Sequence, residues 1–365
     1  MLYRWAAKPL LFQMDPEIAH HLTIAGLSTA AAIPGMLSLM HALYGSKERP
    51  ELAVRLWGCE FPNPVGLAAG LDKNGVAVPG LAAIGFGFLE VGTVTPRPQP
   101  GNPQPRLYRL PEDEAIINRM GFNNDGSAAM KRELGRLRRR PVPICVNIGK
   151  NKDTPNEQAA DDYCACIREL YGAADLFAVN ISSPNTPGLR SLQHGEELRQ
   201  LLQAVRGQMD EERRKRGGEE KAVLLKLAPD LTDGELEQAA GTALDAGVSG
   251  LIATNTTLAR SGLTHRHAGE AGGLSGRPLK QRSLEVIHRL YRVTQGRIPL
   301  VGSGGIFTAD DAYERIRAGA SLIEIYTALI YEGPELLKRL NEGLAARLEA
   351  DGFRHVGEAV GSGHR

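Results

Sequence analysis

Short apolar runs alternate with longer amphipathic stretches from about residue 62 onward, as strands alternate with helices in α/β proteins. Each of the eight runs has the length of one buried strand: 65–68, 88–94, 144–148, 176–181, 223–227, 250–254, 299–301 and 322–326. The stretches between them include clear helices, such as 195–216 and 233–246. This α/β pattern predicts a (β/α)8 TIM barrel, with a doubly wound parallel sheet as the alternative.

The first part of the chain follows a different pattern. Residues 22–46 contain no Asp, Glu, Lys or Arg, which raises the question of a membrane span. Small residues dominate there, and Pro34-Gly35 interrupts the stretch, so we expect two short helices near 16–32 and 36–44. Neither is long enough to cross a bilayer. Such helices either lie in the headgroup region of a membrane or cap the main core, and the pattern alone favours neither.

These patterns divide the chain into three parts. Residues 1–46 form a small N-terminal two-helix extension, 47–347 form the barrel, and 348–365 form a flexible C-terminal tail that is rich in glycine. Arg4 and Lys8 are followed by acidic and histidine residues before the apolar stretch begins, which is the wrong order for a secretory signal.

Composition excludes several classes of function. The chain has 43 Lys and Arg against 42 Asp and Glu, so no overall charge attracts nucleic acid. Basic residues in 131–140 are spaced by leucines and indicate a solvated helix face. Cysteines 59, 145, 164 and 166 form neither a CxxC pair nor a zinc-ligand pattern, so we expect reduced thiols and no metal site.

Polar or glycine-rich residues follow every one of the eight predicted strands. In chain order they are 69–74, Thr93 and Thr95, Asn147 and Lys150, Asn180 with Ser183 and Asn185, Lys226, 254–256, 302–305, and Tyr326 with Thr327. Each alone is an ordinary strand end. Because the carboxyl ends of barrel strands share one rim, their coincidence predicts an active site there.

The residue types on this rim favour a large cofactor that carries a phosphate. Residues 302–305 are followed by Thr308, which indicates a tight loop feeding a helix N-terminus where backbone N–H groups could bind phosphate. Amides and lysines predominate, without paired carboxylates or a histidine cluster, which disfavours glycoside hydrolysis and metal chemistry. Flavin mononucleotide (FMN) fits, with a lysine beside the electron-rich edge of its ring.

Long motifs in the chain resemble those of a known family. They are AAGLDKNG from Ala68, VGTVTPRPQPGNPQPR from Val91, NRMGFNN from Asn118, NIGKNKDTP from Asn147, NISSPNTPGLR from Asn180, KLAPD from Lys226, ATNTT from Ala253 and GGLSGRPL from Gly272. They resemble dihydroorotate dehydrogenases of the membrane-associated, quinone-using class, from about residue 1 to 345. The resemblance implies an FMN barrel that oxidises dihydroorotate to orotate in pyrimidine synthesis and reduces a membrane quinone, its co-substrate.

The resemblance also implies roles for individual residues. Ser183 would be the catalytic base, with Thr186 and Phe122 beside it. Substrate would contact Lys73, Asn118, Arg119, Met120, Gly121, Phe122, Asn180, Asn185, Asn255 and Thr256. One FMN per chain would contact Ala69, Gly70, Leu71, Asp72, Lys73, Thr93, Asn147, Asn180, Lys226, Thr254, Gly276, Gly305, Tyr326 and Thr327. His20, Arg109 and Tyr326 match positions that line the quinone site of relatives.

In the quinone-using class, two helices ahead of the barrel form an apolar tunnel mouth on the membrane surface. The resemblance therefore implies a peripheral protein at the cytoplasmic face of the inner membrane, without an obligate protein partner. Three alternatives stay open: the soluble class of the same enzyme, a barrel enzyme that uses Lys226 as a Schiff-base nucleophile, and a scaffold without activity. Against the soluble class stand Ser183, where that class has cysteine, and the helical extension.

Overall fold

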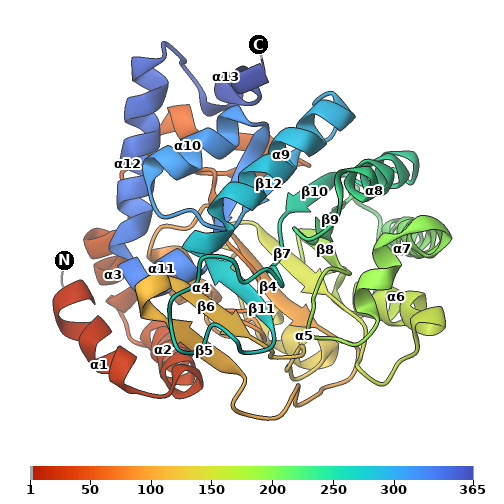
Figure 1. Cartoon of the computed structure of the whole chain (residues 1–365), viewed down its shortest axis with the longest axis horizontal. Coiled ribbons are helices and arrows are strands. Elements are labelled where there is room, and N and C mark those ends of the chain that lie inside the picture. Colours follow the sequence, from red (N-terminus) through yellow and green to blue (C-terminus); the bar gives the residue numbers. More distant parts are fainter. Residues whose placement is uncertain (1–2, 365) are drawn as a thin grey trace.

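A closed barrel of eight parallel strands forms the centre of the computed structural model, which describes residues 3–364 (Figure 1). The strands are β3 (Val65–Leu67), β4 (Phe88–Val94), β7 (Ile144–Ile148), β8 (Leu176–Asn180), β9 (Ala222–Leu227), β10 (Gly250–Ala253), β12 (Leu300–Ser303) and β13 (Ala320–Ile325). Parallel pairing of β13 with β3 closes the ring. The predicted TIM barrel is confirmed, with every strand within two residues of its expected bounds, and the doubly wound alternative is wrong.

Helices surround the barrel and connect its strands. They are α4 (Val78–Ala83), α5 (Ser127–Gly135), α6 (Ala159–Leu170), α7 (Gly195–Arg216), α8 (Asp233–Asp245), α9 (Lys280–Thr294), α10 (Ala309–Arg317), α11 (Thr327–Glu332) and α12 (Glu335–Ala350). Short 3-10 turns lie at Pro50–Leu52, Pro111–Asp113, Asn156–Gln158, Leu189–Gln193, Arg277–Leu279 and Ser362–His364. Helix α8 begins with a capping box between Thr232 and Glu235, which fixes its first turn.

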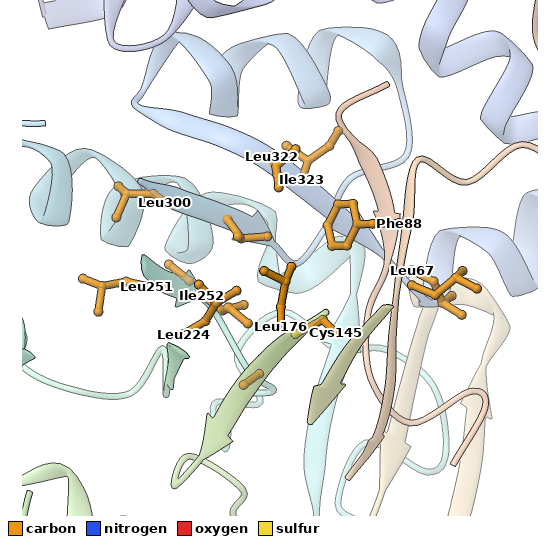
Figure 2. Close-up of a cluster of buried hydrophobic side chains, with 14 of the residues drawn as sticks. Leu67, Phe88, Cys145, Leu176, Leu224, Leu251, Ile252, Leu300, Leu322 and Ile323 are labelled. Carbon is orange, nitrogen blue, oxygen red and sulfur yellow. The ribbon is translucent and has the colours of Figure 1, made fainter. Parts of the chain in front are cut away.

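The core is packed inside the barrel and between the barrel and its helices. Figure 2 shows side chains from all eight barrel strands gathered in one cluster, among them Leu67, Phe88, Leu176, Leu224 and Leu300. Each of these five is at most 2 % exposed. Full burial of such a side chain stabilises a fold by about 1.5–3 kcal/mol. The lower barrel is therefore a packed support for the polar rim.

Two small sheets were not predicted. Strands β1 (Val54–Leu56) and β2 (Cys59–Phe61) form a hairpin, and β5 (Leu107–Leu110), β6 (Ala115–Asn118) and β11 (Gly273–Gly276) form an antiparallel three-stranded sheet. In the second sheet, Asn118 pairs with Leu107 on one side and Gly273 on the other. These strands have three or four residues each, too few for a clear alternation of apolar and polar positions.

The N-terminal extension contains a π-helical turn (Tyr3–Ala7) and the helices α1 (Lys8–Gln13), α2 (Pro16–Ala32) and α3 (Met36–Tyr44). The two expected helices are confirmed as α2 and α3, and α1 was missed. Helices α2 and α3 meet at 119° across the break at Pro34-Gly35. No single described helix is both long and apolar enough to span a membrane, although the bent pair together has the required length and composition. The extension lies beside α11 and α12 (Figure 1).

The C-terminal segment differs from the sequence-based expectation of a flexible tail over 348–365. Helix α12 continues to Ala350, and α13 (Val356–Ala359) follows after a short turn. Val356 and Ala359 are buried, and the Gly361 N–H donates to the Ile316 carbonyl of α10. Two apolar side chains and a backbone hydrogen bond are enough to dock a segment whose glycine content obscured its apolar positions.

Candidate active site

A cavity lies at the carboxyl ends of the barrel strands, on the rim that the sequence predicts. Residues at the ends of seven barrel strands line it, all except β7 among the described residues. The three-stranded sheet contributes Leu107, Ile116, Asn118 and Ser275, and α2 contributes His20. The cavity is therefore bounded by the barrel, the small sheet and the N-terminal extension together.

Most predicted site residues line this cavity. They are His20, Ala69, Gly70, Lys73, Thr93, Asn118, Met120, Gly121, Phe122, Asn180, Ser183, Asn185, Lys226, Thr254, Asn255, Thr256, Gly276, Gly305, Tyr326 and Thr327. Lining residues that the sequence did not single out include Leu107, Ile116, Ser275, Phe307 and Glu324. A glutamate within the apolar run 322–326 was a signal that could have identified Glu324.

Five predicted site residues, namely Leu71, Asp72, Asn147, Arg119 and Arg109, do not line the cavity. Asp72 is fully buried and accepts hydrogen bonds from the Val76 and Ala77 N–H groups, so it fixes the loop after β3. Leu71 is also buried, in the hydrophobic core.

The two arginines point away from the cavity. Arg119 pairs with Glu270 at 2.9 Å, which ties β6 to the loop after β10. Arg109 donates to the carbonyl of Leu11 at 2.7 Å and to that of Met14, at the end of α1. Its guanidinium lies 4.7 Å from the centre of the Phe12 ring. In this structure Arg109 therefore holds α1 against the small sheet.

A buried hydrogen-bond network lies beneath the polar rim. Asn180 Nδ2 donates to Thr93 Oγ1 at 2.9 Å and to Asn147 Oδ1 at 3.1 Å. Thr93 Oγ1 in turn donates to Asn147 Oδ1 at 2.5 Å. All three side chains are buried. Asn147 thus acts below the cavity by holding Thr93 and Asn180, which do line it, in fixed rotamers.

Lys226 is the buried cation of the site. Its Nζ lies 2.5 Å from Glu90 Oε2 and 3.5 Å from Glu324 Oε2. Burial alone would lower the pKa of Lys226, but the two carboxyl groups outweigh it and raise that pKa above its ordinary value. Lys226 therefore presents a positive charge to the cavity, and its ion pair with Glu90 disfavours a role as Schiff-base nucleophile.

The loop after β8 carries Ser183 into the cavity. Ser183 Oγ accepts a hydrogen bond from the Asn185 N–H at 3.2 Å. Asn185 Nδ2 donates to Asn118 Oδ1 at 3.3 Å, and Asn255 Nδ2 donates to Ser182 Oγ at 3.0 Å. Arg190 anchors the loop through the Ser182 carbonyl at 3.0 Å and Asp230 at 2.7 Å. Hydroxyl and amide groups converge here in a form suited to a flat ligand with carbonyl and carboxylate edges.

A contact between His20 and Lys73 joins the extension to the site. His20 Nε2 lies 3.3 Å from Lys73 Nζ, and both side chains line the cavity. Burial and the Lys73 charge lower the pKa of His20 to about 2, so its imidazole is neutral. Burial lowers the pKa of Lys73 to about 8. The neutral imidazole can accept a hydrogen bond from the ammonium group.

Glycines shape the part of the cavity between β11 and β12. A Cβ on Gly305 would lie 2.4 Å from Lys280 Cα, and one on Gly276 would lie 2.4 Å from the Glu114 carbonyl oxygen. Only glycine fits at either position. The N-terminus of α10, where a phosphate contact was expected, is partly occupied, because a capping box between Thr308 and Asp311 uses the N–H groups of both residues. The Gly276, Gly305 and Thr327 segments, which line the cavity, are the remaining candidates.

Comparison with known proteins agrees with this geometry. The profile of the family described as dihydroorotate dehydrogenase matches residues 51–348. The chain belongs to this family. It is 56 % identical over 361 residues to the dihydroorotate dehydrogenase (quinone) of Deinococcus deserti, covering 99 % of both chains. It is 53 % identical over 365 residues to the enzyme of the same name from Deinococcus radiodurans, covering 98 % of this chain and 99 % of the relative.

Solved structures of the family share the fold over nearly the whole chain. The dihydroorotate dehydrogenase of Eimeria tenella in complex with ferulenol superposes with a TM-score of 0.88 at 41 % identity, covering 96 % of each chain. Its ligand-free form gives a TM-score of 0.87 at 41 % identity, covering 96 % of this chain and 100 % of that one. The family match and the near full-length identity to these relatives place the chain in the quinone-dependent class of dihydroorotate dehydrogenases, which are oxidoreductases of pyrimidine synthesis.

Proposed function

We propose that the cavity binds one FMN beside dihydroorotate, and that Ser183 is the base in dihydroorotate oxidation. The single observation that supports this most strongly is the convergence of Ser183, five amide side chains, Lys226 and a glycine-shaped pocket in one cavity. When bound, FMN would supply the acceptor for the hydride that leaves C6 of dihydroorotate. All other steps of this half-reaction fall to residues of the chain.

The residues present fit FMN. Lys226 offers a buried ammonium group to the electron-rich edge of the flavin ring, and the Gly276, Gly305 and Thr327 segments leave room for a phosphate close to the backbone. Thr93 and Asn180 are held by Asn147 as fixed hydrogen-bonding groups for the ring. Leu71, Asp72 and Asn147 then support the FMN site from behind its lining.

Ser183 takes the C5 proton of dihydroorotate in this proposal. The Asn185 N–H, which donates to Ser183 Oγ, orients the hydroxyl. No carboxylate or histidine contacts Ser183 among the described residues, so the proton must leave through a hydroxyl or water relay, and Thr186, buried in the same loop, is a candidate for it. Asn118, Asn185, Asn255 and Thr256 would hold the pyrimidine, and Lys73 its carboxylate.

Quinone would enter between the N-terminal extension and the barrel, near His20 and Tyr326. Both residues line the cavity, whereas Arg109 would shape the entry by fixing α1. Large apolar side chains on the extension are exposed, among them Trp5 at 81 % and Leu10 at 67 %. A peripheral position on the inner face of the cell membrane would cover this surface and admit the quinone directly.

An anaerobic titration tests the proposal. The purified protein should be yellow, dihydroorotate should bleach the flavin absorbance, and a soluble quinone should restore it whereas fumarate should not. A colourless protein that FMN cannot reconstitute would contradict the FMN assignment. Restoration by fumarate would place the chain with the soluble class instead.

A further inference from the structure

Three ionisable side chains meet at the base of the cavity: Lys226 on β9 and Glu324 on β13, which line it, and Glu90 on β4, which lies behind its lining. Their exposed fractions are 4 %, 1 % and 0 %. One buried ammonium group thus faces two buried carboxyl groups. Either the cluster carries a net negative charge, or one carboxyl group is protonated. A net buried charge is costly, which favours the protonated state.

The contacts identify which carboxyl group holds the proton. Glu90 accepts three hydrogen bonds, from Lys226 Nζ at 2.5 Å, the Ala69 N–H at 2.7 Å and Asn147 Nδ2 at 2.6 Å. That is the environment of an ionised carboxylate. Glu324 lies 3.5 Å from Lys226, and its Oε2 has no hydrogen-bond partner among the described residues. An ionised carboxylate in this position would lack the hydrogen bonds that its buried charge needs. A neutral carboxylic acid needs fewer of them.

No other charge near Glu324 changes this assignment. Besides Glu90 and Lys226, the titratable group that faces the cluster is the Cys145 thiol on β7, whose pKa is raised by burial, so it is neutral. The neighbouring strands β3 and β12 carry no ionisable residue. Burial and the Glu90 charge raise the pKa of Glu324 to about 8, against the opposing effect of Lys226.

We propose that Glu324 is a neutral carboxylic acid at neutral pH, and that its ionisation at alkaline pH lowers the reduction potential of the bound flavin. This inference rests on the proposed FMN site, since Lys226 and Glu324 both line its cavity. Two-electron reduction of a flavin adds negative charge, which a neutral cluster tolerates and an anionic cluster opposes. When Glu324 is ionised, reduction therefore draws one proton from solvent onto its carboxylate. Glu324 is a positioning residue for charge and touches no reacting atom.

The test compares the reduction potential of the bound FMN in the wild-type holoenzyme and in Glu324→Gln from pH 6 to 10. Glutamine keeps the shape of the neutral acid and cannot ionise. The two potentials should coincide near pH 6 and separate above the Glu324 pKa of about 8, with the wild type lower. We expect about a tenfold change in the equilibrium constant, or about 30 mV for a two-electron couple. Equal potentials at every pH would overturn the proposal, and so would an equally large separation at pH 6.

Infrared spectroscopy provides a readout that does not depend on the flavin. The wild type should show the carbonyl stretch of a buried, protonated carboxyl group at pH 7, and Glu324→Gln should lack it. In Glu90→Gln, Glu324 becomes the sole carboxylate partner of Lys226, so the band should disappear there as well. Persistence of the band in Glu324→Gln would overturn the assignment. A protein without FMN would still give the band, so failure of the cofactor proposal is distinguishable.

Discussion

Ser183 stands among amides and backbone groups, without the histidine or carboxylate partner that activates most catalytic serines. In the proposed role of base, its reactivity would therefore come from its position and from a path for the proton. Because the sequence places the residue in a loop with two prolines, its position was predictable. Its hydrogen bond to the Asn185 N–H was not, because that contact depends on how the loop folds back on itself.

Ser183→Ala should leave the flavin bound and slow its reduction by dihydroorotate by about 10²–10⁴-fold, the usual contribution of a general base. Anaerobic stopped-flow absorbance measures this half-reaction directly. Ser191→Ala is the matched control, because Ser191 lies in the same loop, its hydroxyl group bonds to the Gly188 carbonyl and Asn156 Nδ2, and it does not line the cavity. Near-normal flavin reduction in Ser183→Ala would contradict the proposal that Ser183 is the base.

The positions of single site residues were only partly predictable from the sequence. Strand ends could be read from the pattern, so Lys226, Asn180 and Thr254 were expected on the rim, and they line the cavity. Glu324 was missed because an isolated glutamate in an apolar run has no partner in the sequence. Only the closed ring brings Lys226 and Glu90 beside it. Arg109 and Arg119 were expected at the site, and their side chains instead bind the Leu11 carbonyl and Glu270, contacts that the sequence does not reveal.

At the scale of elements, a buried ion pair fastens α2 to the barrel. Arg106 Nη2 lies 2.6 Å from Glu17 Oε1, and the two side chains are only 9 % and 6 % exposed. Arg106 also donates to the carbonyls of Pro100 and Asn102 at 2.6 and 2.7 Å. Asn102 Nδ2 then donates to the Asn185 carbonyl at 3.1 Å. Contacts between Glu17 and Arg106, Arg106 and Asn102, and Asn102 and Asn185 thus connect the extension to the Ser183 loop.

Glu17→Gln should lower the free energy of unfolding by about 3–5 kcal/mol, because the charge of Arg106 would stay buried without its partner. Chemical denaturation measures the loss. Arg55→Ala is the matched control: its pair with Glu60 is 85 % and 74 % exposed, and its loss should cost about 0.5 kcal/mol or less. A loss in Glu17→Gln no larger than this control value would show that the pair does not fasten α2.

The ion pair between Glu17 and Arg106 also makes the stability of the fold depend on pH. Burial acts to raise the pKa of Glu17, but the hydrogen bond and charge of Arg106 outweigh it and lower that pKa below its ordinary value. The unfolded state then binds more protons than the folded state in the acid range, so stability falls as the pH drops through the Glu17 pKa. In the acid range, the free energy of unfolding of Glu17→Gln should therefore change less with pH than that of the wild type.

The small sheet shows why the elements were only partly predictable. The barrel strands and the long helices carry enough residues for a hydrophobic period to be visible. Their bounds were therefore predicted to within two residues. Strands β5, β6 and β11 have four residues each, and β11 pairs with β6 across more than 150 positions in sequence. Their pairing follows from long-range contacts that no local pattern contains. Yet this sheet supplies Asn118, Leu107 and Ser275 to the cavity.

At the scale of the whole molecule, exposed apolar side chains are concentrated on the N-terminal extension. Among the described residues, seven of the eight exposed large hydrophobic residues lie there: Trp5, Leu10, Ile18, Leu22, Ile33, Leu39 and Leu43. Such a concentration of exposed apolar side chains on one part of a fold indicates an interaction with lipid or protein. The pattern in the sequence predicted the helices, but not which of their faces would remain uncovered.

Replacing Trp5, Leu10 and Leu22 together with serine should weaken binding to lipid vesicles by at least about tenfold, because each buried apolar side chain contributes roughly 1.5–3 kcal/mol. Cosedimentation with vesicles measures this. Leu258→Ser is the control, since Leu258 is 52 % exposed but lies after β10, outside the extension. Unchanged binding of the triple variant would locate membrane contact elsewhere.

The docking of the extension has a consequence for protein synthesis. Tyr3 donates to the Ile330 carbonyl at 2.6 Å, 327 positions later in the chain, and Arg4 pairs with Glu332. At roughly 5–20 residues per second, the ribosome takes roughly 15–65 s after Tyr3 to synthesise its partner Ile330. During that interval the apolar helices have no barrel to rest on. The apolar helices of the extension therefore emerge before the barrel that they dock against is complete.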